Sequence, residues 1–241
     1  MDFRYRFFDT LSSTNDEARK DVYSHGDVIV ARTQTAGRGQ RGSTWSGEQG
    51  SSLMLSMVLE PSFLEAGRQF QLLQCVALSV ADMFESYGLD PRIKWTNDIY
   101  IGDRKIVGIL IEQSLRGGFI GRCVAGIGIN VNQRRFEEWI PNPTSMALET
   151  GATYDLRQVL ERLCKALDVR YEQLRTGQYE TLSADYGKIM YRIGRLSHFV
   201  LPDGKTVCGT VRGVKPAGEL VVEFEDGSCG AFLFGDIRFV I

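Results

Sequence analysis

The sequence lacks any surplus of basic charge and any long apolar segment. Its 28 Lys and Arg residues are matched by 30 Asp and Glu residues, which leaves a formal net charge of −2 at pH 7. A chain without a basic excess is not a general nucleic-acid binder. The longest apolar runs, such as Leu53–Leu59, are far shorter than a membrane span requires, and Met1–Arg4 opens with mixed charge, unlike a signal peptide. We therefore expect a cytoplasmic protein with no nucleic-acid or membrane partner.

Cysteine and histidine are also scarce. The five cysteines are odd in number and widely spaced, and they form no C-x-x-C pair. The two histidines, His25 and His198, are near no cysteine or carboxylate cluster in the sequence. This pattern argues against a disulfide framework and against a zinc site. Reduced thiols in a cytoplasmic protein are the expectation.

Periodic apolar residues predict an α+β unit of helices and strands over residues 1–192. The helical period predicts helices over 12–24, 67–87, 155–175 and 178–190, with Ser13 as the N-cap of the first. Strands are predicted at Val28–Ala31, Leu53–Leu59, Ile93–Trp95, Ile99–Ile101, Lys105–Gln113, and from the Arg116–Gly118 turn through Asn130. Residues 132–146 contain two prolines and are predicted to form a loop.

The character of the chain changes after Ile193-Gly194. Short β-like runs are separated by Asp203-Gly204, Ala217-Gly218 and Asp226-Gly227, which are hairpin signals. Residues 193–241 are therefore predicted to form a small β-barrel. A unit of this size buries little apolar surface alone, so we expect it to dock on the larger domain.

The most unusual segment is Thr35–Trp45, here named the Gly-Arg loop. Three glycines and two arginines fall within six residues, directly after a predicted strand. Glycine lets backbone N–H groups approach a ligand, and arginine donates in a fork to carboxylate or phosphate oxygens. The loop suits an anionic, phosphate-bearing ligand; the alternative is a flexible surface connector. It matches neither the Walker A motif nor the Rossmann fingerprint.

A second candidate segment is Lys94-Trp95-Thr96-Asn97-Asp98, at the end of a predicted strand. Lys94 suits a carboxylate or an α-phosphate, and Asp98 could hold a magnesium ion. The alternative is a solvated strand end followed by an ordinary Asn-Asp turn.

The third segment alternates glycine with apolar residues from Gly126 to Asn130. Alternate glycines weaken a strand and mark close approach of another group to the backbone. The functional interpretation is a floor for a flat ligand, and the alternative is tight packing against a strand or helix.

Taken together and in this order, the motifs resemble the biotin–protein ligase family. They are Gly37–Gly42 with Trp45, Lys94–Asp98, Lys105–Glu112 and Gly126–Asn130, and Ser13–Asn15 matches that family's early biotin-contacting segment. The resemblance implies a mixed β-sheet flanked by helices, the class II synthetase-like catalytic domain of biotin and lipoate ligases. It also implies that the C-terminal β-barrel is SH3-like.

The chain departs from the family pattern at two positions and in one possible domain. Gln40 stands where many members have Arg, and Thr96 where many have Pro. Some members carry an N-terminal winged helix that binds DNA. Only a dozen residues precede Ser13 here, so we expect the short form, a biotin–[acetyl-CoA-carboxylase] ligase without repressor activity.

The resemblance implies an ATP-dependent reaction with Mg²⁺ and with biotin as substrate. The implied partner is a biotin carboxyl carrier protein or domain of a biotin-dependent carboxylase, and two copies of the chain could pair through sheet edges. The implied catalytic residues are Lys94 and Arg38. The implied biotin-binding residues are Ser13, Thr14, Asn15, Gln34, Arg38, Gly39, Gln40, Lys94, Gly108, Gly126 and Gly128. The implied ATP or adenylate contacts are Arg38, Arg41, Trp45, Lys94, Asn97 and Asn130, with Asp98 as the candidate metal ligand.

Two other functions compete with this prediction. A lipoate–protein ligase would share the fold and the acyl-adenylate chemistry, but the Gly-Arg loop and the C-terminal β-domain favour biotin. A non-catalytic binding module would use the C-terminal domain as a peptide surface. The phenylalanines of that domain alternate like core residues, which disfavours a peptide groove.

Overall fold

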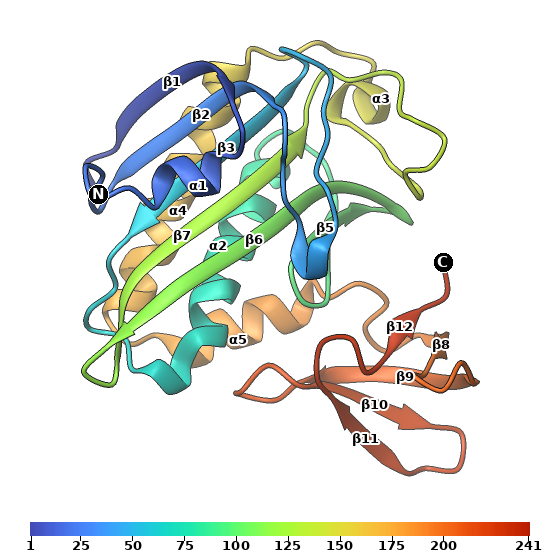
Figure 1. The fold of residues 1–241 in the computed structure, drawn as a ribbon. Coiled ribbons are helices and arrows are strands. Elements are labelled where there is room, and N and C mark those ends of the chain that lie inside the picture. Colours follow the sequence, from blue (N-terminus) through green and yellow to red (C-terminus); the bar gives the residue numbers. More distant parts are fainter.

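A seven-stranded mixed sheet organises the N-terminal part of this computed structural model, which describes all 241 residues except the side chain of Arg41. The strand order is β1-β2-β3-β7-β6-β5-β4 (Figure 1). The strands are β1 Arg4–Leu11, β2 Asp27–Gln34, β3 Ser52–Leu59, β4 Pro91–Lys94, β5 Asp98–Ile101, β6 Arg104–Arg116 and β7 Phe119–Asn130. β1 pairs with β2 in parallel at one edge, and every other neighbouring pair is antiparallel.

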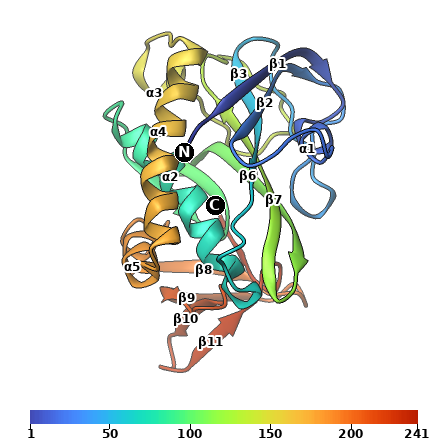
Figure 2. The same cartoon turned by 90° about the vertical axis from the view of Figure 1, so that its left-hand side faces the viewer.

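Helices cover one face of this sheet. They are α2 Gln69–Glu85, α4 Leu156–Arg175 and α5 Tyr179–Lys188, and Figure 2 shows them together on one side, with α1 Thr14–Ala18 on the other. The remaining helices are α3 Met146–Thr150 and the 3₁₀ turns η1 Gln40–Gly42 and η2 Ala66–Arg68.

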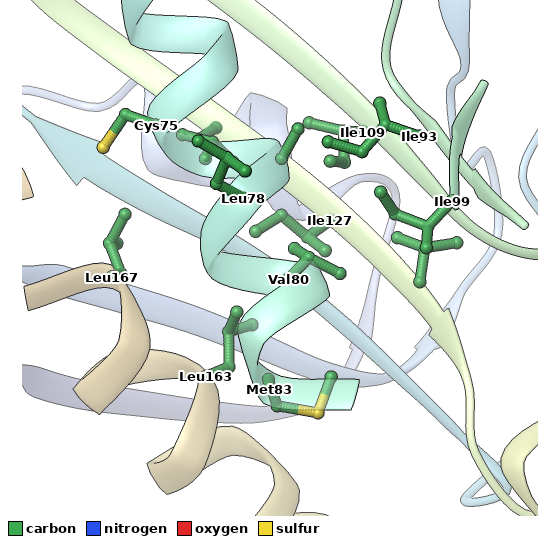
Figure 3. Packing of buried hydrophobic residues seen from close by; sticks show 14 of the residues in the cluster. Cys75, Leu78, Val80, Met83, Ile93, Ile99, Ile109, Ile127, Leu163 and Leu167 are labelled. Carbon is green, nitrogen blue, oxygen red and sulfur yellow. The ribbon is translucent and has the colours of Figure 1, made fainter. Parts of the chain in front are cut away.

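Alternation along β7 decides which face becomes the core. Ile127 and Ile129 are buried in the main hydrophobic cluster, as is Ile109 of β6, and Figure 3 shows Ile127 and Ile109 beside Leu78 of α2. Each such side chain contributes roughly 1.5–3 kcal/mol on burial. Because side chains of a strand alternate between faces, the intervening glycines lie on the opposite face. That face carries the site described below.

A second sheet forms the C-terminal domain. It contains β8 Leu196–Val200, β9 Thr206–Val214, β10 Leu220–Phe224, β11 Cys229–Phe232 and β12 Arg238–Phe239. The order is β11-β10-β9-β8-β12, and all pairs are antiparallel, so the expected barrel takes the form of a five-stranded antiparallel sheet. The hydrophobic cluster of the first sheet continues into this one. The proposed division at residues 192 and 193 therefore stays a prediction.

One turn docks this domain onto the first. Trp95 Nε1 donates to the carbonyl oxygen of Gly218 over 2.8 Å, and Gln71 Nε2 donates to that of Pro216 over 3.2 Å. Gly218 has φ +99°, and a Cβ there would lie 2.7 Å from the Phe70 ring. The Ala217-Gly218 hairpin signal therefore marks a docking turn as well as a change of direction.

The predicted elements differ from the structure in two respects: the first helix is shorter than expected, and β1 was not predicted. The helix expected over 12–24 ends at Ala18 after five residues, and Ser13 occupies the N-cap position without a side-chain hydrogen bond. The loop expected over 132–146 is confirmed; it ends where α3 begins at Met146, with the Ser145 hydroxyl accepting from Leu148 N–H. β1 was not predicted, because an edge strand with a half-exposed pattern lacks a clear apolar period.

The structure bears on two expectations from composition. All five cysteines are free, and three of them are buried: Cys75, Cys123 and Cys164. Among the described residues, no helix is both long enough and apolar enough to cross a membrane.

Candidate active site

A cavity of about 850 Å³ lies on the sheet face that carries the glycines of β6 and β7. It brings together every motif singled out in the sequence: the start of α1, the end of β2, the Gly-Arg loop, the Lys94–Asp98 turn, and β6 with β7. The predicted residues that line it are Ser13, Thr14, Asn15, Gln34, Arg38, Gly39, Gln40, Trp45, Lys94, Asn97, Asp98, Gly108, Gly126 and Gly128. Segments more than a hundred residues apart in the sequence, such as Ser13–Asn15 and Gly126–Gly128, thus meet at one place.

A network of buried polar groups forms one end of the cavity. Gln34 Oε1 accepts from the backbone N–H of Thr14 over 2.7 Å and from its hydroxyl over 3.1 Å. The hydroxyl of Ser56 lies 2.8 Å from Thr14 Oγ1 and 2.5 Å from Asn15 Oδ1. Ser13, Thr14, Asn15 and Ser56 are all buried. Buried polar atoms of this kind are held in place by their partners, so this end can bind a polar head group with fixed donors and acceptors.

No role in the site was predicted for Ser56 from the sequence. It lies in β3, where all eight residues are buried, and the surrounding apolar run indicates only a core strand. The position of a hydroxyl on the cavity side becomes visible only when α1 is placed against the sheet.

The glycine floor is occupied by side chains of the protein itself. A Cβ at Gly126 would overlap the Asn15 amide, and a Cβ at Gly128 would overlap the Trp45 indole. At Gly108 a Cβ would lie 2.9 Å from the same indole ring. The close approach predicted for these glycines is therefore present. At Gly126 it is made by Asn15 of helix α1, and at Gly108 and Gly128 by Trp45 of the Gly-Arg loop.

The Gly-Arg loop closes on itself at the cavity mouth. Arg38 and Thr44 form a β-bridge, Gly39 N–H donates to Ser43 O over 2.6 Å, and Trp45 N–H donates to Gly37 O over 3.0 Å. In Figure 1 this blue segment runs as a long loop between β2 and β3. Its fold brings the two ends together and leaves the middle to reach over the cavity.

Side chains of the loop differ in what they contact. Arg38 Nη2 pairs with Asp16 Oδ1 at 2.7 Å and with Glu112 Oε2 at 3.2 Å. Gln40 Oε1 and Trp45 Nε1 are buried and have no hydrogen-bond partner within the described part of the chain. Both residues line the cavity, and each has a buried polar atom that is left without a partner there. The predicted contact from Arg41 lies outside the described residues.

The Lys94–Asp98 turn is fastened to β6. The Asn97 side-chain amide donates to Ile109 O, and Ile109 N–H donates to Asn97 O over 3.1 Å. Thr96, which replaces the commoner proline, is buried, and its carbonyl accepts from the Tyr186 hydroxyl over 2.9 Å. The turn is therefore supported from both sides.

Two lysines face the cavity from this turn and from β6. Burial lowers the pKa of Lys94 from its ordinary value, and the charge of nearby Asp98 offsets part of this shift. Lys105, to which no role was given from the sequence, pairs with Asp98 at 2.8 Å. A cavity with Arg38, Lys94 and Lys105 on its lining favours an anionic ligand.

Asn130 does not line the cavity. It is buried at the end of β7, and its side-chain amide donates to Thr144 O over 2.9 Å. Its Nδ2 thus supports the 132–146 loop, and the predicted contact with a nucleotide stays a prediction.

Metal binding rests on a single carboxylate. Within the described residues, no group of three or more His, Cys, Asp or Glu side chains could hold a metal ion. Asp98 is the only acidic side chain on the described cavity lining. Any divalent ion here would take most of its ligands from a bound phosphate and from water.

The C-terminal domain also contributes to the cavity, which the sequence did not indicate. Its lining residues are Val200, Phe234, Gly235, Ile237, Arg238, Phe239, Val240 and Ile241. Arg238 adds a further cation, and the Phe239 ring centroid lies 6.0 Å from Lys94 Nζ. The two domains thus build the cavity together.

Comparison with known proteins identifies the relatives of this chain. The model of the biotin/lipoate A/B protein ligase family matches residues 7–130. The bifunctional ligase/repressor BirA of Salmonella typhimurium is 33% identical over 216 residues, covering 88% of this chain and 66% of the relative. The biotin–[acetyl-CoA-carboxylase] ligase of Mycobacterium tuberculosis is 32% identical, covering 82% of this chain and 73% of the relative. The chain thus spans about two thirds of the length of BirA.

A solved structure extends the likeness to both domains. The biotin protein ligase of Aquifex aeolicus in complex with biotin and ATP superimposes with a TM-score of 0.83 at 26% identity. The superposition covers 98% of this chain and 98% of the other. Both the mixed sheet and the C-terminal sheet therefore have counterparts in that protein.

Proposed function

The chain belongs to the biotin/lipoate A/B protein ligase family, and on that premise we propose that it joins biotin to one lysine of a carrier protein. In the first step, the biotin carboxylate attacks the α-phosphorus of ATP to give biotinyl-adenylate and pyrophosphate. In the second, the lysine amine attacks the mixed anhydride and AMP leaves. The observation that carries this proposal is one cavity that combines a buried polar pocket with four cationic side chains, Arg38, Lys94, Lys105 and Arg238.

The head group of biotin occupies the polar end in this proposal. Its ureido ring carries both donors and acceptors, and leaving any of them unpaired in a buried site is costly. Ser13, Thr14, Asn15 and Gln34 offer complementary groups, and Ser56 orients two of them. A lipoyl group has no ureido ring to satisfy them, so this end of the cavity discriminates between the two acids.

Lys94 and Arg38 act where the two anions meet. The biotin carboxylate and the α-phosphate repel each other, and an ammonium between them lowers the energy of the approach. Lys94 extends from the supported end of β4 and is half-buried, which strengthens its electrostatic effect. Neither step needs a protein nucleophile, so positioning and charge account for the chemistry.

The Gly-Arg loop closes over the intermediate. Arg38, Gly39 and Gln40 line the cavity from this loop, and closure would keep water away from the anhydride. Trp45 and Asn97 are assigned to the nucleotide side, together with Arg41. Asn130 stays a proposed contact on the adenine side, and its Nδ2 is engaged with Thr144 O.

Magnesium would enter with the nucleotide. In nucleotide sites this ion keeps several waters and takes one or two carboxylates besides the phosphates. Asp98, the acidic side chain on the described lining, is the residue proposed to hold it, and the ion would supply neutralisation of phosphate charge.

The acceptor is proposed to be a biotin carboxyl carrier protein or domain. The Mycobacterium tuberculosis relative is named a biotin–[acetyl-CoA-carboxylase] ligase, which supports a carboxylase partner. We place the reaction in the cytoplasm. Two copies of the chain could also pair through the β1 edge of the sheet, which size-exclusion chromatography would test.

One assay tests the proposal. The protein is incubated with Mg²⁺-ATP and either biotin or lipoate, and the acyl-adenylate is detected by mass spectrometry. A carrier domain is then added, and its mass is followed. We expect biotinyl-adenylate and a carrier heavier by one biotinyl group. Lipoyl-adenylate in its place would assign the rival ligase activity, and binding of biotin without ATP turnover would indicate a binding module.

A further inference from the structure

One carboxylate outside the assigned residues connects the polar pocket to the Gly-Arg loop. Glu112 lies on β6, and its side chain is 22% exposed. Its Oε2 accepts from Asn15 Nδ2 over 2.8 Å and from Arg38 Nη2 over 3.2 Å, while its Oε1 pairs with Arg19. We propose that Glu112 is a positioning residue that couples the head-group pocket to closure of the Gly-Arg loop, an inference that rests on the proposed ligase function.

On the pocket side, Glu112 fixes the orientation of the Asn15 amide. The Asn15 oxygen lies 2.5 Å from the Ser56 hydroxyl, and its nitrogen donates to Glu112. An amide oxygen and nitrogen have opposite hydrogen-bonding roles, so these two partners select one of the two flipped arrangements. The glycine at position 126 lets the side chain lie against β7 in this arrangement.

On the loop side, Glu112 holds one corner of the Arg38 guanidinium. Both pairs of this residue, with Asp16 and with Glu112, use the same nitrogen, Nη2. A guanidinium has five N–H donors in a rigid fork, and three of them belong to Nε and Nη1. Anchoring Nη2 therefore sets the direction of the fork while other donors serve a ligand anion.

Glu112 is better placed than Asp16 for this role. The Asp16 side chain is 45% exposed and that of Glu112 is 22% exposed. Solvent and salt screen the more exposed pair more strongly. Glu112 also belongs to a central strand, whereas Asp16 lies on the five-residue helix α1.

The coupling follows from the sharing of one oxygen atom. Because Oε2 serves both Asn15 and Arg38, a shift of either donor alters the acceptor available to the other. A head group that presses on Asn15 therefore changes how firmly the loop arginine is anchored. Binding at the polar end and retention at the loop end become linked.

The test compares Glu112→Gln with the wild-type chain. A glutamine offers one acceptor oxygen and turns an NH₂ group toward a guanidinium, so it cannot serve Asn15, Arg19 and Arg38 together. Each enzyme forms biotinyl-adenylate from biotin and Mg²⁺-ATP, is freed of substrates by rapid gel filtration, and is followed for release of the intermediate. We expect release to be about tenfold faster in Glu112→Gln. Release at the wild-type rate would overturn the proposal.

A double-mutant cycle with Arg38→Gln separates positioning from a general loss of structure. If Glu112 acts through Arg38, the double variant should release the intermediate no faster than Arg38→Gln alone. Multiplicative effects of the two substitutions would overturn the coupling.

Glu112→Asp keeps the carboxylate and provides a second variant if the glutamine form is unstable. Its release rate should lie between those of wild type and Glu112→Gln. A wild-type rate would count against the proposal.

Glu60→Gln is the matched control, because Glu60 also pairs with an arginine beside the sheet, Arg122 at 3.7 Å, but lies outside this cavity. It should release the intermediate as the wild type does.

A readout without substrates distinguishes this inference from the proposed function. Limited trypsin digestion of the full chain should cleave the Arg38–Gly39 bond several-fold faster in Glu112→Gln than in Glu60→Gln. If the wild type makes no biotinyl-adenylate, the proposed function fails and the digestion still tests the anchoring of Arg38. If the wild type makes it but both variants are cleaved equally and retain it equally, only the role of Glu112 is overturned.

Discussion

The two sides of the cavity are held by different forces. The wall formed by α1, β3, β6 and β7 rests on buried groups, and its polar residues Ser56, Thr14 and Asn15 are enclosed by the sheet and its short helix. The Gly-Arg loop opposite is closed by its own backbone hydrogen bonds, and its Arg38 side chain, 38% exposed, is held to the rest of the site by ion pairs. Close packing permits little movement, whereas partly solvated ion pairs exchange partners readily. The wall is therefore suited to recognition and the loop to closure.

The largest expected effect comes from removing Lys94, the cation at the end of β4. Lys94→Ala should slow adenylate formation by roughly 100- to 1,000-fold, because a preorganised charge at the reacting centre is lost. Pyrophosphate release in single-turnover experiments measures this step. Lys188→Ala, which removes an exposed lysine of α5, should leave it unchanged. An active Lys94→Ala enzyme would show that the reacting groups meet elsewhere.

A smaller and different effect is expected on the loop side. Arg38→Gly removes the arginine that crosses the cavity mouth, so the intermediate should escape about 30-fold faster and label exposed lysines of bystander proteins. Mass spectrometry of a bystander such as serum albumin measures the labelling. Formation of the intermediate should change less than its retention. The opposite order of effects would place Arg38 with the wall instead.

A methyl group added to the wall tests its rigidity. A Cβ at Gly128 overlaps the Trp45 indole, and overpacking of this kind costs about 1–3 kcal/mol. Gly128→Ala should raise the KM for biotin or ATP by about tenfold. Gly187→Ala is the control, because a Cβ at that helical position meets no atom within 4 Å. An unchanged KM would indicate that the glycine floor and Trp45 rearrange to accommodate the methyl group, and that the floor is as mobile as the loop.

The smallest expected effect is a loss of folding stability at acidic pH, caused by protonation of Asp27 at the start of β2. Asp27 is buried, and its hydrogen bond with Arg4 lowers the pKa of its carboxyl to about 2 from 3.8. A lowered folded-state pKa contributes stability that is complete well above pH 4 and is lost as the pH falls toward 2. The loss should be roughly 1 to 2 kcal/mol after allowance for screening of the half-exposed arginine. Urea unfolding between pH 6 and pH 2 measures it, and Asp27→Asn should lack this part of the pH dependence.

Most of the site could be predicted because its residues are of types that are uncommon in the elements that carry them. Glycines alternating with isoleucines in β7 indicate a close approach on one face and a core on the other, and both are present. Lys94 at a strand end and the arginines of the Gly-Arg loop carry charges that the core does not need. The fold of the first domain followed from strands and helices with clear apolar periods.

The rest depended on contacts between distant segments. In the sequence, Ser56 is indistinguishable from its neighbours in a core strand, and only its contact with Asn15 of α1 shows a role in the site. In the same way, Glu112 resembles an ordinary polar residue of β6, and only its contacts with Asn15 and Arg38 distinguish it. Asn130 was assigned a ligand because of its motif, but its amide is engaged by Thr144 O in the following loop. The C-terminal lining residues lack any local signal, because domain docking alone brings them to the cavity.

The Trp45 indole lies on the glycine floor and therefore competes with any ligand ring for the same surface. Any flat ring that settles on Gly108 and Gly128 must displace an aromatic ring already in contact with them. The net affinity for such a ring is then the difference between two similar stacking energies, and it is smaller than the contact area suggests. A ligand that instead lies against the outer face of the indole keeps both contacts. The floor thereby favours ligands that stack on the Trp45 indole over ligands that displace it.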